Sequence, residues 1–100
     1  MARALALSDI QFNVAQVAEL FKDVLKVSLF GSYAKGEQNK KSDIDLLVEF
    51  GDKATYITVF DFQSTVEKKI GKEVEVIPAP IPEDSFLKIE KEILLYERKR

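Results

Sequence analysis

Apolar side chains recur along the chain at regular spacings, and each spacing predicts the kind of element that the stretch forms. Near the N-terminus, four apolar residues are separated by four, three and four positions: Ile10, Val14, Val17 and Phe21. This spacing places them on one face of a helix, so we predict a first helix from about Ser8 to Lys22. Ser8 and Gln11 have the spacing of a capping box, which would start that helix.

The same spacing predicts a second long helix in the middle of the chain, on Val59, Phe62, Val66 and Ile70. This helix runs from about Ala54 to Ile70, and Gly71 suits the left-handed residue that ends many helices. Towards the C-terminus, four more residues follow a comparable spacing: Phe86, Ile89, Ile93 and Tyr96. They predict a final helix.

Three shorter runs are rich in β-branched and aromatic residues and predict strands: Lys26–Phe30, Asp43–Phe50 and Glu73–Ile77. The second run is apolar enough to be buried on both faces of a sheet. Three alternating prolines follow the third run, and they make that stretch extended and rigid because proline fixes its own φ and restricts the preceding residue.

The elements follow one another as helix, strand, strand, helix, strand, helix. This order predicts an α/β fold in which a small mixed β-sheet has helices packed on at least one face. A chain of 100 residues suits one domain, so we predict a single domain over residues 1–100. The stretch from Gly31 to Asp43 is too long for a tight hairpin and has no strand pattern, which marks it as the functional loop.

Composition narrows the classes of function. Apolar residues make up 46% of the chain and charged residues 32%, as in a soluble globular domain. The net charge of −2 argues against direct binding to a nucleic-acid backbone. No apolar run approaches the roughly 18 residues of a membrane span. No signal peptide is visible either, so we expect a cytoplasmic protein that does not enter membranes.

Two aspartates, Asp43 and Asp45, stand at the start of the second predicted strand. Residues two apart in a strand point to the same face, so their carboxylates would be neighbours and would repel each other. The chain has no histidine and no cysteine, so a metal ion between them would be held by oxygen alone, which favours Mg²⁺, Mn²⁺ or Ca²⁺. The alternative is that both aspartates lie on a solvated strand end.

A third carboxylate would allow two metal ions to be held together. The third predicted strand offers Glu73 and Glu75 on one face. Glu73 stands at the start of that strand, where water would surround it. Glu75 lies between two valines, deeper in the strand, and is the better candidate for a third ligand.

The turn Gly31-Ser32 follows an apolar strand and precedes the expected start of a short helix, in a stretch from Ser32 to Lys41 that is predicted as a polar loop or a short helix. Glycine allows close backbone approach, and the N–H groups of such a turn and the Ser32 hydroxyl can bind phosphate oxygens. Lys35 is the best placed of the loop lysines to meet a triphosphate, whereas Lys40 and Lys41 suit a solvated loop. A glycine–serine pair after a strand is often only a turn; beside two aspartates it suggests a site for a metal–triphosphate complex.

Gly31-Ser32, Gly36 and the run from Ser42 to Val48 together resemble the signature of the DNA polymerase beta superfamily of nucleotidyltransferases. The short chain is similar in length to the minimal nucleotidyltransferases. That branch resembles the antitoxin of HEPN–nucleotidyltransferase toxin–antitoxin pairs. The resemblance covers nearly the whole chain.

The resemblance implies transfer of a nucleoside monophosphate, AMP from ATP, to a hydroxyl with pyrophosphate leaving. For this branch the implied acceptor is a tyrosine of a partner HEPN toxin, and the transfer silences that toxin. Asp43 and Asp45 match the two family metal ligands. Glu75 falls where the family usually has a third aspartate, so catalysis would use Asp43, Asp45 and Glu75 with two Mg²⁺ ions.

The same resemblance assigns nucleotide binding to Gly31, Ser32 and Lys35, although an arginine is common where Lys35 stands. Glu75 is one methylene longer than aspartate, which could weaken catalysis. Two other functions therefore stay open. The chain could be a binding module of the same fold that neutralises or completes a partner protein, or a domain that binds Mg²⁺ and a nucleoside triphosphate without transfer.

Overall fold

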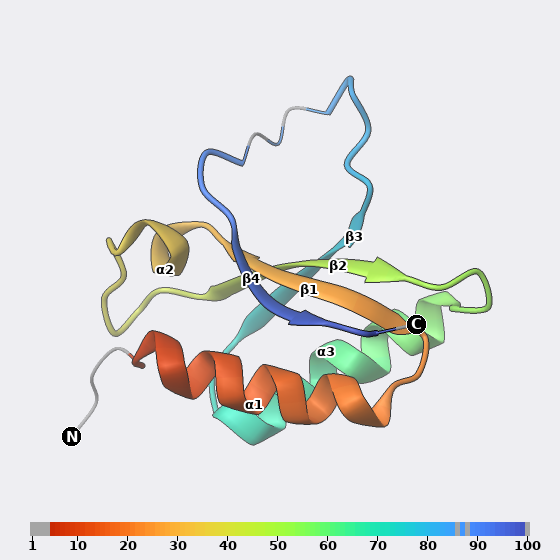
Figure 1. The fold of residues 1–100 in the computed structure, drawn as a ribbon. Helices are drawn as coiled ribbons and strands as arrows, with labels where there is room; N and C mark the ends of the chain where they lie inside the picture. Colours follow the sequence, from red (N-terminus) through yellow and green to blue (C-terminus); the bar gives the residue numbers. More distant parts are fainter. Residues whose placement is uncertain (1–4, 86, 88, 100) are drawn as a thin grey trace.

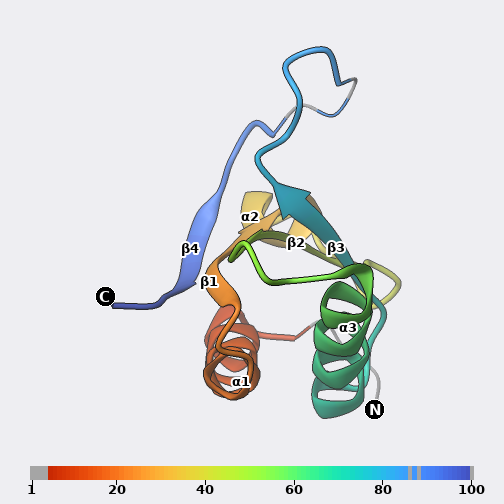
Figure 2. The same ribbon diagram turned by 90° about the vertical axis from the view of Figure 1, so that its right-hand side faces the viewer.

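The computed structural model describes residues 5–85, 87 and 89–99. A four-stranded sheet carries two long helices, α1 and α3, on one of its faces (Figures 1 and 2). The elements in chain order are α1 (Leu7–Leu20), β1 (Val24–Phe30), α2 (Ser32–Lys35), β2 (Ile44–Phe50), α3 (Tyr56–Ile70), β3 (Val74–Ala79) and β4 (Ile93–Glu97). No helix of the described residues combines the length and the apolar character needed to cross a membrane.

The strands lie in the order β3-β2-β1-β4. β1 is antiparallel to both β2 and β4, whereas β2 and β3 run parallel. The long helix α3 makes the crossover between the two parallel strands, as such a connection requires. The prediction of a small mixed sheet with helices packed on it is therefore confirmed.

The core lies between the sheet and the two long helices. The α1 side chains that were predicted to share a face are buried or half-buried there, as are alternate side chains of β2, namely Ile44, Leu46 and Val48. Phe62 of α3 is fully buried, and its ring meets those of Phe21 and Phe50 edge-on at centroid distances of 5.6 and 6.3 Å. Such edge-to-face pairs add to the stabilisation from burial.

The prediction that β2 is buried on both faces is wrong. Between the buried residues of β2, Asp45 and Leu47 are only half-buried. The reason is that α1 and α3 cover the same face, so no long helix of the described residues covers the opposite face of the sheet (Figure 2). That open face is where Asp45 and Glu75 lie.

The start of α1 also differs from the prediction. The helix begins at Leu7, and its N-cap residue is Ala6, which makes no side-chain capping bond. Ser8 therefore lies inside the first turn, and the predicted capping box with Gln11 is wrong. Leu5 packs against the core, which accounts for the earlier helix start.

The predicted final helix is wrong as well, because β4 occupies the end of the chain. Ile93 and Tyr96 belong to this strand, Ile89 precedes it, and Phe86 lies outside the described residues. β4 pairs with the free edge of β1 and buries Leu95 against the core. A run of β-branched, leucine and aromatic side chains suits such a half-buried strand as well as it suits a helix.

Arg98, just after β4, links the C-terminal segment to the C-terminal end of α1 and to the start of β1. Its Nε donates to the carbonyl of Val24 at 3.1 Å, and its Nη2 donates to the carbonyls of Ala18 at 2.9 Å and Phe21 at 3.1 Å. Hydrogen bonds from a charged group are among the stronger ones, so we expect Arg98→Ala to lower the free energy of unfolding by about 2–3 kcal/mol. Urea denaturation would measure this, with the exposed Lys99→Ala as control; equal midpoints for the two variants would contradict the assigned role.

Candidate active site

Asp45 lies at one end of the sheet, between β1 and β3. In the antiparallel pairing it stands opposite Phe30, the last residue of β1, and in the parallel pairing it stands opposite Glu75 of β3. Ile44 and Val74, which precede this pair in their strands, are buried towards the helices. Asp45 and Glu75 therefore share the open face of the sheet.

Gly31 brings the glycine turn into contact with this carboxylate. Its φ is 75° and its ψ is −155°, a region that is essentially restricted to glycine. A Cβ at Gly31 would overlap Oδ2 of Asp45 and would lie 3.1 Å from the Cγ of the same side chain. The predicted adjacency of the glycine turn and the aspartate strand is thus present, and only glycine leaves room for it.

Among the described residues, Asp45 forms no salt bridge with a lysine or an arginine. The pKa of its carboxyl is raised above the ordinary value of 3.8, mainly by burial and further by the negative charges of Glu75 and Asp43. All three causes act in the same direction. The two other predicted ligands are therefore close enough to be felt electrostatically, and a cation would relieve the repulsion among the three carboxylates.

Asp43 and Glu75 are less enclosed than the sequence suggested. Asp43 is exposed just before β2, and Glu75 is exposed on β3 although it stands between two buried valines. Both line a hollow of about 300 Å³ together with Glu73 and residues of α3. Among the described residues, no three carboxylates are already gathered into a ready-made metal site. The donor set itself, hard oxygens with an excess of negative charge, fits Mg²⁺.

A short turn immediately precedes Asp43, and it was not predicted from the sequence. The backbone N–H of Asn39 donates to the Ser42 hydroxyl at 2.9 Å, and the N–H of Ser42 donates to the Asn39 carbonyl at 3.0 Å. The Asn39 side chain also accepts from the N–H of Lys41 at 2.8 Å. Asparagine and serine commonly make such local bonds, so their presence just before the aspartate was the available signal.

The loop lysines have different surroundings. Lys35 ends α2, and its Nζ lies 3.1 Å from Oε2 of Glu90, an exposed residue that precedes β4. A triphosphate at the glycine turn would therefore compete with Glu90 for Lys35. Lys40 and Lys41 are exposed, as expected of a solvated loop, and Lys72 ties this loop to the start of β3 by donating to the Lys40 carbonyl at 2.9 Å.

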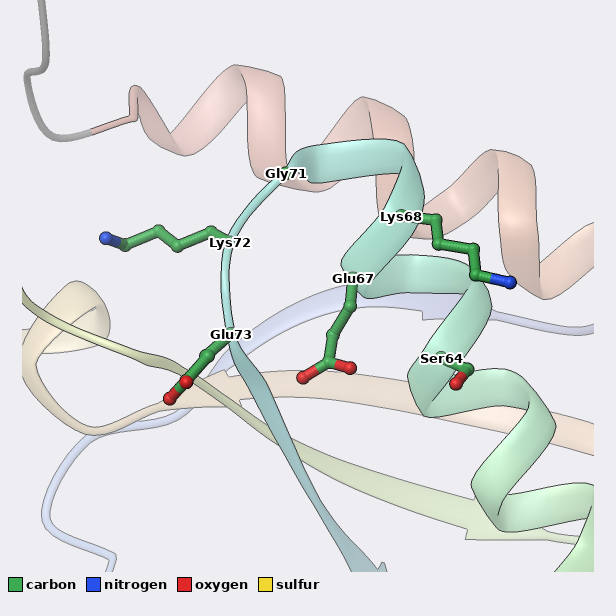
Figure 3. A pocket seen from close by; sticks show the side chains of 6 residues that line it. All are labelled: Ser64, Glu67, Lys68, Gly71, Lys72 and Glu73. Atoms are coloured by element: carbon green, nitrogen blue, oxygen red, sulfur yellow. The ribbon is translucent and has the colours of Figure 1, made fainter.

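Two polar side chains of α3 reach β3, and they too went unpredicted. Glu67 accepts a hydrogen bond from the N–H of Val74, and Gln63 accepts one from the N–H of Val76. Figure 3 shows Glu67 extending from α3 towards the start of β3, whereas Lys72 points away from it. The hollow in that view, about 460 Å³ at the C-terminal end of α3, contains none of the predicted ligands or nucleotide-binding residues.

The family model "Polymerase beta, Nucleotidyltransferase" matches residues 13–100. A Methanocaldococcus jannaschii protein named "Putative protein adenylyltransferase MJ1379" is 34% identical over 96 residues, a match that covers 88% of this chain and 95% of the relative. "Putative protein adenylyltransferase MJ0435" of the same organism is 44% identical over 54 residues. That match covers 54% of this chain and spans 58% of the length of the relative.

Solved structures share the fold. A mutant MntA–HpeT toxin–antitoxin structure gives a TM-score of 0.72 at 15% identity, with 89% of this chain and 74% of that chain covered. A structure of tri-AMPylated Shewanella oneidensis HEPN toxin in complex with MNT antitoxin gives a TM-score of 0.57 at 16% identity, with 89% and 73% covered. At such low identities these likenesses establish the fold alone.

A mixed sheet backed by two helices, with a glycine turn set against a strand-borne carboxylate, defines a domain of the nucleotidyltransferase class. The family model covers most of the chain. The chain belongs to the polymerase beta nucleotidyltransferase family, and the resemblance seen in its sequence is confirmed.

Proposed function

We propose that this protein is a Mg²⁺-dependent adenylyltransferase that moves AMP from ATP to a hydroxyl of a partner protein, a tyrosine of a HEPN toxin, and so acts as its antitoxin. The observation that carries the proposal is the contact between the Gly31 turn and the carboxylate of Asp45, with Glu75 beside Asp45 in the sheet. A turn suited to phosphates and a carboxylate meet at one point. Relatives named as protein adenylyltransferases support the same chemistry.

The residues divide the work as follows. Asp43, Asp45 and Glu75 would hold two Mg²⁺ ions. When bound, Mg²⁺ would neutralise charge on the triphosphate and lower the pKa of the acceptor hydroxyl. The Gly31 amide, the Ser32 hydroxyl and the Lys35 ammonium would bind the β- and γ-phosphates.

The transfer is a displacement at the α-phosphorus. A bond forms between the acceptor oxygen and that phosphorus, the bond from the phosphorus to the bridging oxygen breaks, and pyrophosphate leaves with the electron pair. Glu75 takes the proton of the acceptor hydroxyl. Its exposure on the open face lets it meet a hydroxyl that arrives on another protein.

The direct test mixes the purified protein, a HEPN toxin co-expressed with it, Mg²⁺ and each nucleoside triphosphate in turn. We expect an adenylyl group on a toxin tyrosine with ATP, located by mass spectrometry, and stoichiometric pyrophosphate. Asp43→Asn is the matched negative control, because it removes charge from one proposed ligand. Labelling that is unchanged in Asp43→Asn would refute the assigned roles.

A binding module without catalysis is the second candidate. The absence of a gathered three-carboxylate site among the described residues favours it, and so does a cluster of exposed apolar side chains on α3, namely Tyr56, Ile57 and Phe60. Under this function, Asp43→Asn would leave complex formation and toxin neutralisation intact while no pyrophosphate forms with any variant.

Glu75→Asp separates the two candidates further. A carboxylate misplaced by about 1 Å can cost on the order of 10²-fold in rate, so an enzyme slowed by the longer side chain should gain up to that factor. The initial rate of AMP transfer measures the gain. Glu73→Asp, a change of the same kind two residues earlier, is the control and should change nothing. A rate that Glu75→Asp leaves unaltered would contradict the idea that the extra methylene slows catalysis.

A further inference from the structure

We infer that Gln63 and Glu67 of α3 are positioning residues for Glu75, because they hold β3 from its outer side. The inference rests on the proposed role of Glu75 in the transfer. It goes beyond that role by adding two residues that would act through the backbone of β3.

β3 is an edge strand, with β2 on one side only. Its pairing with β2 runs through the Glu73 carbonyl, which accepts from the N–H of Ile44 at 3.0 Å, and places Glu75 opposite Asp45. The backbone N–H groups of successive residues in a strand point to opposite edges, so the N–H groups of Val74 and Val76 both point away from β2. An exposed edge of this kind is usually mobile or open to other strands.

α3 supplies the missing partners. Oε2 of Glu67 accepts from the N–H of Val74 at 3.0 Å, and Oε1 of Gln63 accepts from the N–H of Val76 at 3.2 Å, both partly shielded from water. The chain turns back at Gly71, so the later helix residue meets the earlier strand residue. One hydrogen bond therefore lies just before Glu75 in the strand, and the other lies just after it.

The spacing of Gln63 and Glu67 along α3 matches the spacing of Val74 and Val76 along β3. Residues four apart on a helix are separated by about 6 Å along its axis, and residues two apart on a strand by about 6.6 Å. Gln63 and Glu67 can therefore bond the two N–H groups in register. The two side chains thus occupy the position that a fifth strand would have. The backbone on either side of Glu75 is then held by β2 on one edge and by α3 on the other.

The two hydrogen bonds would affect catalysis because they would help to fix the distance between Glu75 and Asp45. Glu75 stands on the edge strand, whereas its partner Asp45 stands on an inner strand that is paired on both sides. Loosening β3 would move Glu75 relative to Asp45, and misplacement by about 1 Å is enough to cost on the order of 10²-fold in rate. Glu67 also lines the hollow that Asp43 and Glu75 share, so its charge and its hydrogen bond must be separated by experiment.

The experiment compares Glu67→Met, Gln63→Met and Glu67→Gln in the full chain. Methionine keeps the length of the side chain without the acceptor oxygen, whereas glutamine keeps the oxygen without the charge. In Glu67→Met we expect the amide of Val74 to exchange with D₂O at least about tenfold faster by NMR. We also expect kcat for AMP transfer to fall on the order of tenfold while KM for ATP stays within about twofold.

Glu67→Gln should restore both quantities to near the parent values, and Gln63→Met should act on Val76 in the same way. Asp61→Asn, which removes a charge from an exposed position of the same helix, is the control and should resemble the parent. Faster amide exchange with kcat unchanged would mean that the two side chains merely seal the edge, and would overturn the inference.

A second readout does not depend on transfer. Titration with Mn²⁺ should broaden the amide signals of both Asp45 and Glu75 in the parent chain, and Glu67→Met should weaken the broadening at a given Mn²⁺ concentration because a displaced Glu75 holds the ion less tightly. A parent that binds Mn²⁺ but transfers no AMP would refute the proposed function and leave this comparison to decide the inference. Equal broadening at Glu75 in parent and variant would overturn the inference, and absence of broadening in the parent would overturn both.

Discussion

Asp45→Asn is expected to lower the rate of AMP transfer on the order of 10³-fold and, at neutral pH, to raise the melting temperature of the protein. The loss of rate follows because Asp45 is a proposed metal ligand that lies against the glycine turn, and charge stabilisation by a bound metal contributes several kcal/mol to such a reaction. The gain in stability follows because the parent carboxylate is half-buried beside two other negative charges. The same residue is thus costly to the fold and needed by the chemistry.

The pH dependence of this gain has a definite sign. The pKa of Asp45 is raised in the folded protein by burial and by the charges of Glu75 and Asp43, so the folded state holds the Asp45 proton more tightly than the unfolded chain does. Stability of the parent therefore falls as the pH rises from the unfolded value of 3.8 through the raised folded pKa. Asparagine does not titrate, so the difference between variant and parent should be largest at neutral pH and smallest below 3.8.

Thermal unfolding at a series of pH values, with the metal chelated, measures this difference. Asp52→Asn, in the exposed turn after β2, is the control and should leave both the rate and the melting temperature unchanged. Added Mg²⁺ should stabilise the parent and leave Asp45→Asn less affected, since a ligand stabilises only the form that binds it. A variant that melts below the parent at neutral pH, or that retains the parent rate, would contradict the assignment of Asp45.

The core of the fold could be predicted from local patterns, and its last element could not. Apolar residues at helical spacing locate α1 and α3, and the left-handed Gly71, with φ at 78°, ends α3 as predicted. Ile93 and Tyr96 fit a helical spacing equally well, yet they form β4. Strand pairing with β1 decides that outcome, and a partner so distant along the chain leaves no trace in the local pattern.

The candidate site divides in the same way. The contact of Gly31 with Asp45 was foreseeable, since a strand that ends in glycine and a strand that begins with aspartates are neighbours in the chain. The hydrogen bonds that Gln63 and Glu67 accept could not be foreseen. Their donors are backbone N–H groups 13 and 7 residues away, and a backbone N–H gives no signal in the sequence because nearly every residue type has one. The ion pair of Lys35 was hidden for the same reason, as Glu90 comes to it only through the fold.

Gly31→Ala is the second substitution with a large expected effect. The backbone at Gly31 has φ at 75° and ψ at −155°, and holding another residue there costs of order 1–3 kcal/mol in folding free energy. The new Cβ would also displace the Asp45 carboxylate that now lies over the glycine. Because a displacement of about 1 Å can cost on the order of 10²-fold, we expect the initial rate of AMP transfer to fall by roughly that factor in the variant that remains folded.

Gly36→Ala separates the effect of backbone strain from the effect on the carboxylate. Gly36 also has a positive φ, 73°, but no described atom lies within 4 Å of the Cβ position there, so this variant should lose about 1 kcal/mol of stability and keep its rate. A double-mutant cycle between Gly31→Ala and Asp45→Ala then measures the contact itself. Rates and urea midpoints for the four chains should show that Gly31→Ala lowers the rate far less once the Asp45 carboxylate is absent. If both glycine variants slowed transfer equally, or if the two effects on rate simply multiplied, the turn would serve only to shape the backbone and Asp45 would not depend on it for its position.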